Sequence, residues 1–150
     1  MTLTEPTLKP MIRLQRLLPA SPQEVFDAWI DPESLRQWFC PGTVSLASVE
    51  LDVRVGGHFC IVMRDETKDL AHTGEYREIT SPRRLVFTWR SSATYNQETL
   101  VTIELHPKGN ETELVLTHER LLDASSAEKH EGGWQDAVRK LAVYLSMDKE

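Results

Sequence analysis

The chain has 150 residues, of which 40% are hydrophobic and 27% charged, and its formal net charge at pH 7 is -6. That length and balance predict one globular unit with a core of its own and exclude a chain that is disordered throughout. The negative charge and the scattered lysines and arginines argue against a general nucleic-acid-binding protein, because phosphate contacts need clustered positive charge.

The chain carries no apolar run near the roughly 20 residues that cross a bilayer, and its start lacks the basic residues and apolar block of a secretory signal. We therefore expect a cytoplasmic protein that does not bind membranes. In that compartment the two cysteines, Cys40 and Cys60, are expected to be free thiols. Residues 1–10 show no hydrophobic period, which predicts a flexible N-terminus ahead of a single domain over residues 11–147.

The first structured segment is a strand over residues 12–18, predicted from alternating apolar residues. Ser21-Pro22-Gln23-Glu24 then carries the full signature of a helix start, with Ser at the cap, Pro at the first helical position and Glu completing a capping box. Asp31-Pro32 ends that helix and starts a second short one, in which Leu35, Trp38 and Phe39 have helical spacing.

Only short alternating segments follow in the middle of the chain, at the spacing of consecutive hairpins and separated by turn residues. They predict strands over residues 45–51, 58–64, 72–79, 84–90, 98–106 and 112–119.

A long amphipathic helix closes the chain, with Trp134, Val138, Leu141 and Leu145 forming one apolar stripe. Its start is predicted at Ser125 or Ser126, where Ser125 and Glu128 have the spacing of a capping box. Gly132-Gly133 inside this helix predicts either a kink or a close approach of the backbone to a neighbour. The order of elements predicts an α+β fold: a curved antiparallel sheet of about six or seven strands around a long C-terminal helix, with two short helices after the first strand.

Several short motifs occur in an order that identifies a family. In chain order they are PASPQEVFDAW at residues 19–29, WF at 38–39, VGGHF at 55–59, GEYREI at 74–79, PRRLVFTW at 82–89, LTH at 116–118 and GW at 133–134. Together they resemble, over about residues 11–147, the Aha1-like branch of the START/Bet v 1 superfamily, often called SRPBCC proteins. The resemblance implies the single-domain helix-grip fold of that superfamily, with a deep cavity between sheet and last helix that takes apolar molecules.

The branch takes its name from a co-chaperone that activates the Hsp90 ATPase. In that co-chaperone a separate amino-terminal domain contributes strongly, so the resemblance supports the fold more than an Hsp90 partnership. An Hsp90-related or stress-linked interaction module therefore stays an alternative. A homodimer is compatible with the resemblance, although no heptad or exposed apolar stripe in this sequence specifies one.

The sequence predicts that a small hydrophobic or amphipathic molecule binds between the sheet and the last helix. Apolar residues alternate along each predicted strand, so that one face of the strand is expected to lie toward the interior. The residues on that face either fill the core or form the cavity wall. The predicted cavity-lining residues are Trp38, Phe59, Met63, Tyr76, Phe87, Trp89, His118, Trp134, Val138 and Leu141. The chemical identity of the ligand does not follow from these residues.

A cofactor-independent enzyme of the cyclase or hydrolase kind, using the same cavity, is the main alternative to a binding protein. It requires an inward titratable pair, and the candidates are His118, Tyr76 and Glu78, with the last two expected on one strand face. No catalytic residue is assigned, because no nucleophile motif is present. No cofactor or metal is expected either, since the five histidines form no zinc-binding motif, and His130 is expected at the surface or the cavity rim.

Overall fold

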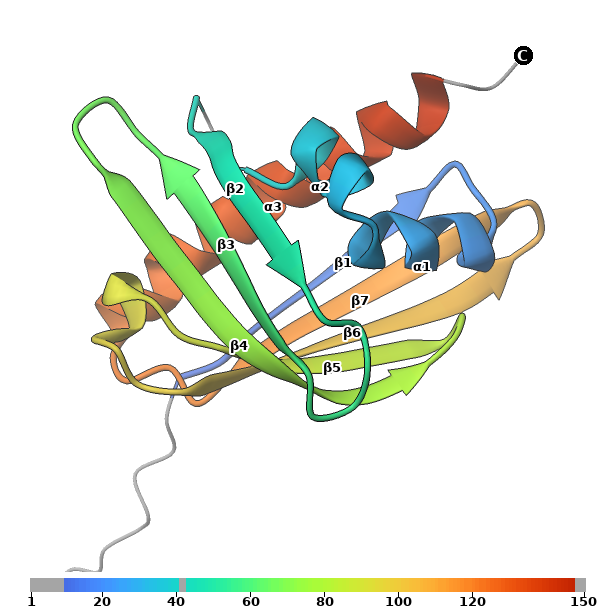
Figure 1. The fold of residues 1–150 in the computed structure, drawn as a ribbon. Coiled ribbons are helices and arrows are strands. Elements are labelled where there is room, and N and C mark those ends of the chain that lie inside the picture. The colour runs from blue at the N-terminus through green and yellow to red at the C-terminus, as the bar shows by residue number, and fades with distance from the viewer. Residues whose placement is uncertain (1–9, 41–42, 148–150) are drawn as a thin grey trace, which may run out of the picture.

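The computed structural model describes residues 10–40 and 43–147. Seven antiparallel strands form one curved sheet in the order β1-β7-β6-β5-β4-β3-β2, and the long helix α3 lies across its concave side (Figure 1). The elements are β1 (Ile12–Leu18), α1 (Pro22–Ile30), α2 (Pro32–Trp38), β2 (Ser45–Leu51), β3 (His58–Arg64), β4 (Asp69–Thr80), β5 (Arg84–Trp89), a short 3-10 turn η1 (Ser92–Thr94), β6 (Thr99–Lys108), β7 (Glu111–Glu119) and α3 (Ala124–Met147). The predicted α+β helix-grip architecture is confirmed. The expected flexible N-terminus lies almost entirely in residues 1–9, outside the described residues.

The two short helices begin as the sequence predicts. Ser21 accepts a hydrogen bond from the Glu24 backbone N–H at 3.2 Å, and the Glu24 carboxylate accepts one from the Ser21 backbone N–H at 3.0 Å. Asp31 ends α1 and caps α2, where its carboxylate accepts from the Ser34 N–H at 3.2 Å. The helices thereby turn tightly, so that α1 packs on β6 and β7 while α2 contacts α3 and β2.

The start of α3 differs from the prediction. The Asp123 carboxylate, rather than the Ser125 hydroxyl, accepts a hydrogen bond from the Ser126 backbone N–H at 2.8 Å. A charged acceptor at this position interacts favourably with the positive end of the helix dipole. The Ser126 hydroxyl donates instead to the Ala93 carbonyl at 2.7 Å, which ties α3 to η1. The predicted capping box is therefore wrong, and α3 runs from Ala124 as one helix through Gly132-Gly133.

A β-bulge in β4 overturns a second expectation. The register against β5 shifts between Tyr76 and Glu78, so that Tyr76 faces the core while Glu78 lies opposite Val86 on the outer side. There the Glu78 carboxylate accepts a hydrogen bond from Arg84 at 3.1 Å. The expectation that Tyr76 and Glu78 share one strand face is therefore wrong, because the extra residue reverses the alternation.

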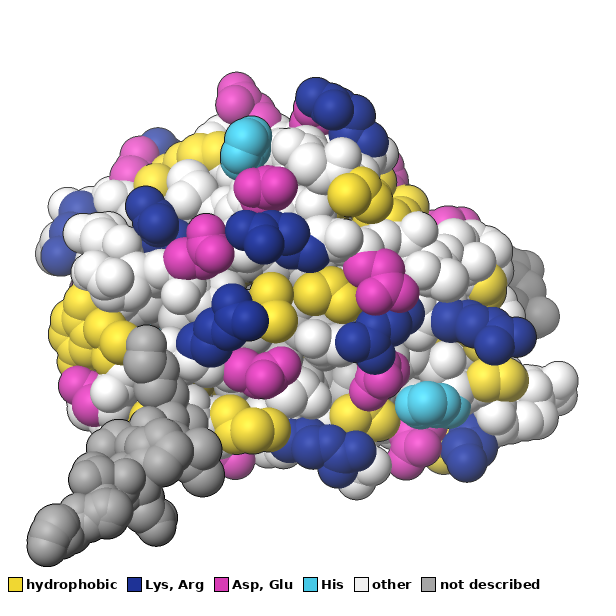
Figure 2. All heavy atoms as spheres, turned by 90° about the horizontal axis from the view of Figure 1, so that it is seen from below, with side chains coloured by type: hydrophobic (Ala, Val, Ile, Leu, Met, Phe, Trp, Pro, Cys, Tyr) yellow, Lys and Arg dark blue, Asp and Glu magenta, His cyan; other side chains and the backbone are white. Residues whose placement is uncertain are grey.

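The two sides of the sheet differ sharply in polarity. The apolar residues that alternate along β3, β5, β6 and β7 are buried against the helices, as the sequence predicts. Figure 2 shows the outer side, where basic and acidic side chains are interleaved; one example is Arg84, which bonds both Glu78 and Glu104. Both cysteines are free thiols. Within the described residues, no helix has the length and apolarity needed to cross a membrane.

Candidate ligand-binding cavity

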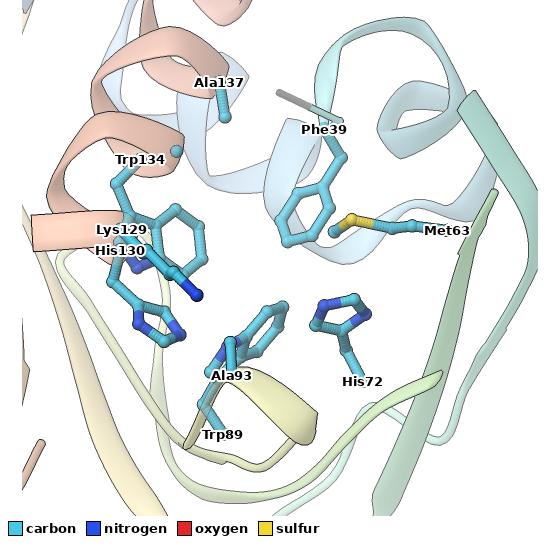
Figure 3. A pocket seen from close by; sticks show the side chains of 10 residues that line it. Phe39, Met63, His72, Trp89, Ala93, Lys129, His130, Trp134 and Ala137 are labelled. Atoms are coloured by element: carbon cyan, nitrogen blue, oxygen red, sulfur yellow. The ribbon is translucent and has the colours of Figure 1, made fainter. Parts of the chain in front are cut away.

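A cavity of about 170 Å³ lies between α3 and the part of the sheet formed by β3, β4 and β5. Figure 3 shows the side chains that surround it. The lining residues are Phe39, Met63, His72, Trp89, Ala93, Lys129, His130, Gly133, Trp134 and Ala137. The walls are predominantly apolar, which is typical of sites for small molecules.

One wall is a single face of α3. His130, Gly133, Trp134 and Ala137 follow each other at the spacing of residues that share a helix face. Gly133 and Ala137 are small, so this face leaves space beside the Trp134 ring. Gly132 is exposed, and a side chain there would meet nothing within 4 Å. Of the glycine pair, only Gly133 borders the cavity, and neither breaks the helix.

The wall beside the α3 face is aromatic and continues from Trp134. The ring centroids of Trp89 and Trp134 lie 5.3 Å apart, and Phe39 lies 6.0 Å from Trp89 and 5.8 Å from Trp134. His72 packs beside Trp89 with its ring centroid at 5.1 Å. These separations are typical of favourable aromatic contacts, so the rings hold one another in place around the cavity.

Behind the Trp134 wall, a chain of hydrogen bonds uses every polar atom of His118. The Trp134 indole N–H donates to Nδ1 of His118 at 3.0 Å, so the proton of the neutral ring must lie on Nε2. Nε2 then donates to the Thr99 hydroxyl at 2.8 Å, and that hydroxyl donates to the Trp89 carbonyl at 2.6 Å. Burial lowers the pKa of His118 to about 3, with a smaller effect from nearby His130. His118 is thus a neutral structural residue with no atom left to meet a ligand.

His130 is different because one of its nitrogens remains available. Nδ1 lies 2.8 Å from the Ser126 carbonyl and must donate to it, which leaves Nε2 of the neutral ring as an acceptor. Burial is the main cause that lowers the pKa of His130, and the positive charge of Lys129 acts in the same direction. The expected surface or rim position is wrong: His130 is only 9% exposed and forms part of the cavity wall. In Figure 3 its ring is turned toward Trp89.

Two further polar groups belong to residues that line the cavity. Lys129 is exposed, so its ammonium group lies where the cavity meets solvent, and it forms no salt bridge with a described residue. The indole N–H of Trp89 also has no hydrogen-bond partner among the residues described, but its nitrogen is fully buried and does not face the cavity. None of the ten described lining residues carries a carboxylate, so the electrostatic character of this lining is neutral to positive.

The residues predicted to line the cavity fall into three groups. Met63, Trp89 and Trp134 lie on its wall. Phe59, Tyr76, Phe87 and again Trp89 surround a separate gap of about 20 Å³, room for little more than one water molecule. The remaining predicted residues, Trp38, His118, Val138 and Leu141, are at most 1% exposed and border neither space.

Sequence reasoning missed the small and polar members of the wall. His130, Gly133 and Ala137 are four, one and three positions from Trp134 and share its helix face. That spacing was a usable signal. The predicted lining instead followed the large apolar residues of the helix and included Val138 and Leu141. His72 and Ala93 gave no comparable signal, because their position beside the cavity depends on how β4 and η1 lie relative to the N-terminal end of α3.

The residues considered for catalysis do not converge. Glu78 is on the outer side of the sheet, and both nitrogens of His118 are engaged in the chain to Trp134 and Thr99. Tyr76 is buried beside the smaller gap, and that burial raises its pKa. The catalytic alternative therefore lacks its expected pair. Among residues 10–40 and 43–147, no three His, Cys, Asp or Glu side chains lie close enough to hold a metal ion.

A curved antiparallel sheet that holds a long C-terminal helix over an apolar cavity defines the helix-grip class of proteins. Residues 19–146 match the family described as activator of Hsp90 ATPase homolog 1-like protein, and the chain belongs to that family. No match was found among curated proteins.

Solved structures agree with this assignment. A protein from Chromobacterium violaceum is 30% identical with a TM-score of 0.85, and the match covers 92% of this chain and 98% of that one. The AHSA1 protein from Silicibacter pomeroyi is 26% identical with a TM-score of 0.81, covering 93% and 100% of the two chains. An AHSA1-like protein from Aeromonas hydrophila, 19% identical with a TM-score of 0.77 over 94% and 99%, shows the same fold.

Proposed function

We propose that this protein binds a small apolar molecule in the cavity between α3 and the sheet. The observation that carries the proposal is the space of about 170 Å³ lined mainly by Phe39, Met63, Trp89 and Trp134. A concave space lined mainly by apolar and aromatic side chains, with few polar groups, is typical of small-molecule sites. Apolar walls favour an apolar guest over water.

The volume limits the guest to a compact molecule. An engineered protein cavity of about 150 Å³ accepts benzene, whereas drug-sized ligands occupy about 300–1,000 Å³. The cavity of about 170 Å³ therefore suits a guest with one ring or a short branched chain. A lipid or a polycyclic molecule requires displacement of lining side chains such as Phe39 or Trp134.

A substitution that fills the cavity tests this proposal. Ala137 is 2% exposed and lines the cavity, so Ala137→Leu places a larger apolar side chain where the guest would lie. Trp89 and Trp134 line the same space, so tryptophan fluorescence reports its occupancy. We expect the wild-type signal to change saturably with toluene, and the Ala137→Leu protein to lose that response.

The matched control is Ala124→Leu, the same chemical change at the exposed first residue of α3. It is expected to leave the toluene response intact. Circular dichroism and the melting temperature of both variants show whether the fold survives. A wild-type protein with no saturable response to toluene or other single-ring and short-chain apolar compounds contradicts the proposal. Equal responses in wild-type and Ala137→Leu protein contradict the assigned cavity.

A further inference from the structure

We propose that the guest is a single-ring aromatic molecule bearing a hydroxyl group, a phenol, and that this hydroxyl donates a hydrogen bond to Nε2 of His130. The inference rests on the proposed function and specifies the ligand class for the same cavity. It is carried by the aromatic rings of the walls, by the acceptor left on His130 and by the charge of the lining.

The rings that line the cavity favour an aromatic guest. Phe39, Trp89 and Trp134 present three aromatic rings whose centroids lie 5.3 to 6.0 Å apart around one space. An aromatic guest meets such rings in edge or offset contacts that an aliphatic guest of equal volume does not make. The volume of about 170 Å³ leaves room for one ring and a small substituent.

The hydrogen bonds already made in the structure leave few polar atoms for a guest. The Trp134 N–H and both nitrogens of His118 are used, and Nδ1 of His72 lies 3.1 Å from the Leu70 carbonyl. His130 keeps Nε2 as a neutral acceptor, and the residue is more buried than His72. Water competes least for a buried acceptor, so a donor on the guest gains most at His130.

The charges around the cavity select a hydroxyl over an amine. Lys129 borders the cavity without a salt bridge to a described residue, and none of the described lining residues is acidic, so a cationic guest is repelled. A phenolic oxygen also accepts hydrogen bonds, and Lys129 is a donor on a lining residue. A hydroxyl is a donor and an acceptor in one atom, which an ether and a methyl group are not.

A ligand series in matched variants tests the inference. Phenol, anisole and toluene share one ring and differ in hydrogen-bonding capacity, and calorimetric titration gives a dissociation constant for each. For each protein, the dissociation constant of toluene is divided by that of phenol, and the quotient is compared between wild-type and His130→Phe protein. The differing water solubility of the two ligands affects both proteins equally and cancels in this comparison. We expect His130→Phe to lower this ratio about tenfold, because a hydrogen bond to a buried group is lost. The ratio of toluene to anisole is expected to change little.

Further variants show which histidine acts. His130→Gln supplies an amide that accepts a hydrogen bond and is expected to restore part of the preference for phenol. His72→Phe removes the other histidine of the wall, and phenol is expected to remain preferred because Nε2 of His130 is still present. The control that is expected to leave the preference unchanged is His106→Phe, at an exposed position on β6 outside the cavity wall. If His72→Phe loses the preference for phenol and His130→Phe keeps it, the hydroxyl binds His72 rather than His130, and the inference is overturned.

The outcomes separate this inference from the proposed function. If toluene binds the wild-type protein but the toluene-to-phenol ratio of dissociation constants is the same in wild-type and His130→Phe protein, the phenol assignment is overturned and the cavity proposal stands. A cavity that binds neither toluene nor phenol overturns both. Retained toluene binding in His130→Phe also shows that the variant is folded with its cavity intact.

Discussion

The indole N–H of Trp134 on α3 donates a hydrogen bond of 3.0 Å to Nδ1 of His118 on β7. This contact fixes the tautomer of the histidine and attaches the cavity-lining face of α3 to the sheet. Thr99 on β6 extends it to the Trp89 carbonyl, so helix and strands are joined behind the cavity wall by groups that all have partners. A fully satisfied buried network of this kind holds its members rigidly.

We expect Trp134→Phe to destabilise the protein more than the same change at Trp29. Both indoles are buried, but Trp29 Nε1 has no hydrogen-bond partner, whereas Trp134→Phe leaves Nδ1 of His118 unsatisfied. An unsatisfied buried acceptor costs about 1–3 kcal/mol, and this is the expected difference in unfolding free energy between the variants. Urea denaturation measures it. Equal losses for the two variants would show that the Trp134 contact contributes nothing beyond packing.

The buried histidine makes stability depend on pH in a defined direction. His118 titrates at about 3 when folded, and its ordinary value of 6.5 applies when unfolded. Between these values the unfolded chain binds the proton and the folded chain does not, so His118 favours folding above about pH 6.5. As the pH falls from 6.5 toward 3, this contribution to the unfolding free energy declines by about 1.4 kcal/mol per pH unit.

Urea denaturation across this pH range measures the dependence in wild-type and His118→Gln protein. The variant is expected to be less stable at pH 7 and to have a shallower pH dependence, because one titrating group is gone. His106→Gln, at an exposed position on β6, is the control and is expected to keep the wild-type slope. A His118→Gln protein with the wild-type slope contradicts the assignment of the slope to this histidine.

Gly132 and Gly56 make a matched pair for backbone conformation. An added Cβ meets nothing within 4 Å at either position, but Gly132 is helical and Gly56 has a φ of +89°. Gly132→Ala is expected to stabilise the protein by about 1 kcal/mol, because alanine favours the helix. Gly56→Ala is expected to destabilise it, because that backbone region disfavours a side chain. Thermal denaturation checks both signs, and a loss of stability in Gly132→Ala would point to a required kink in α3.

The sequence predicted the elements of the fold because their signals are local. Alternation defined the strands, and Ser21 with Glu24 defined the start of α1. The bulge in β4 was missed because its cause is not local: the backbone of Tyr76 bonds Gly56 and Gly57, which precede β3. Hydrogen bonds from a distant loop therefore changed the alternation that the sequence of β4 alone suggests.

The cavity was harder to predict than the core. A core residue is recognised by its own apolarity and period, but a cavity exists where several neighbours together leave space unfilled. Gly133, Ala137 and Ala93 border the cavity because they are small, and His130 does so because its ring turns back to Ser126. Val138 and Leu141 have the stronger apolar signal, and for that reason they fill the core.

Phenol binding should weaken as the pH falls, because protonation converts Nε2 of His130 from an acceptor into a donor. Burial lowers the pKa of His130 below its ordinary 6.5, so the acceptor is present at pH 7 and is lost only below 6.5. His72 and Lys129 line the same cavity, and the His118 ring packs against His130 with the centroids 4.8 Å apart. The lowered pKa values of His72 and His118 place their protonation below 6.5 as well. We therefore expect the phenol dissociation constant to be constant from pH 8 to about 6.5 and to rise at lower pH.

Phenol and toluene are titrated into wild-type, His130→Phe and His72→Phe protein at each pH. The comparison shows whether the pH dependence of phenol binding comes from His130. Toluene has no group that interacts with Nε2, so its binding serves as the measure of cavity integrity. The pH-dependent loss of phenol preference is expected in wild-type and His72→Phe protein and is expected to be absent in His130→Phe. A preference for phenol that persists through the whole range in which His130 becomes charged, followed by NMR of its ring protons, would show that Nε2 does not accept the hydroxyl.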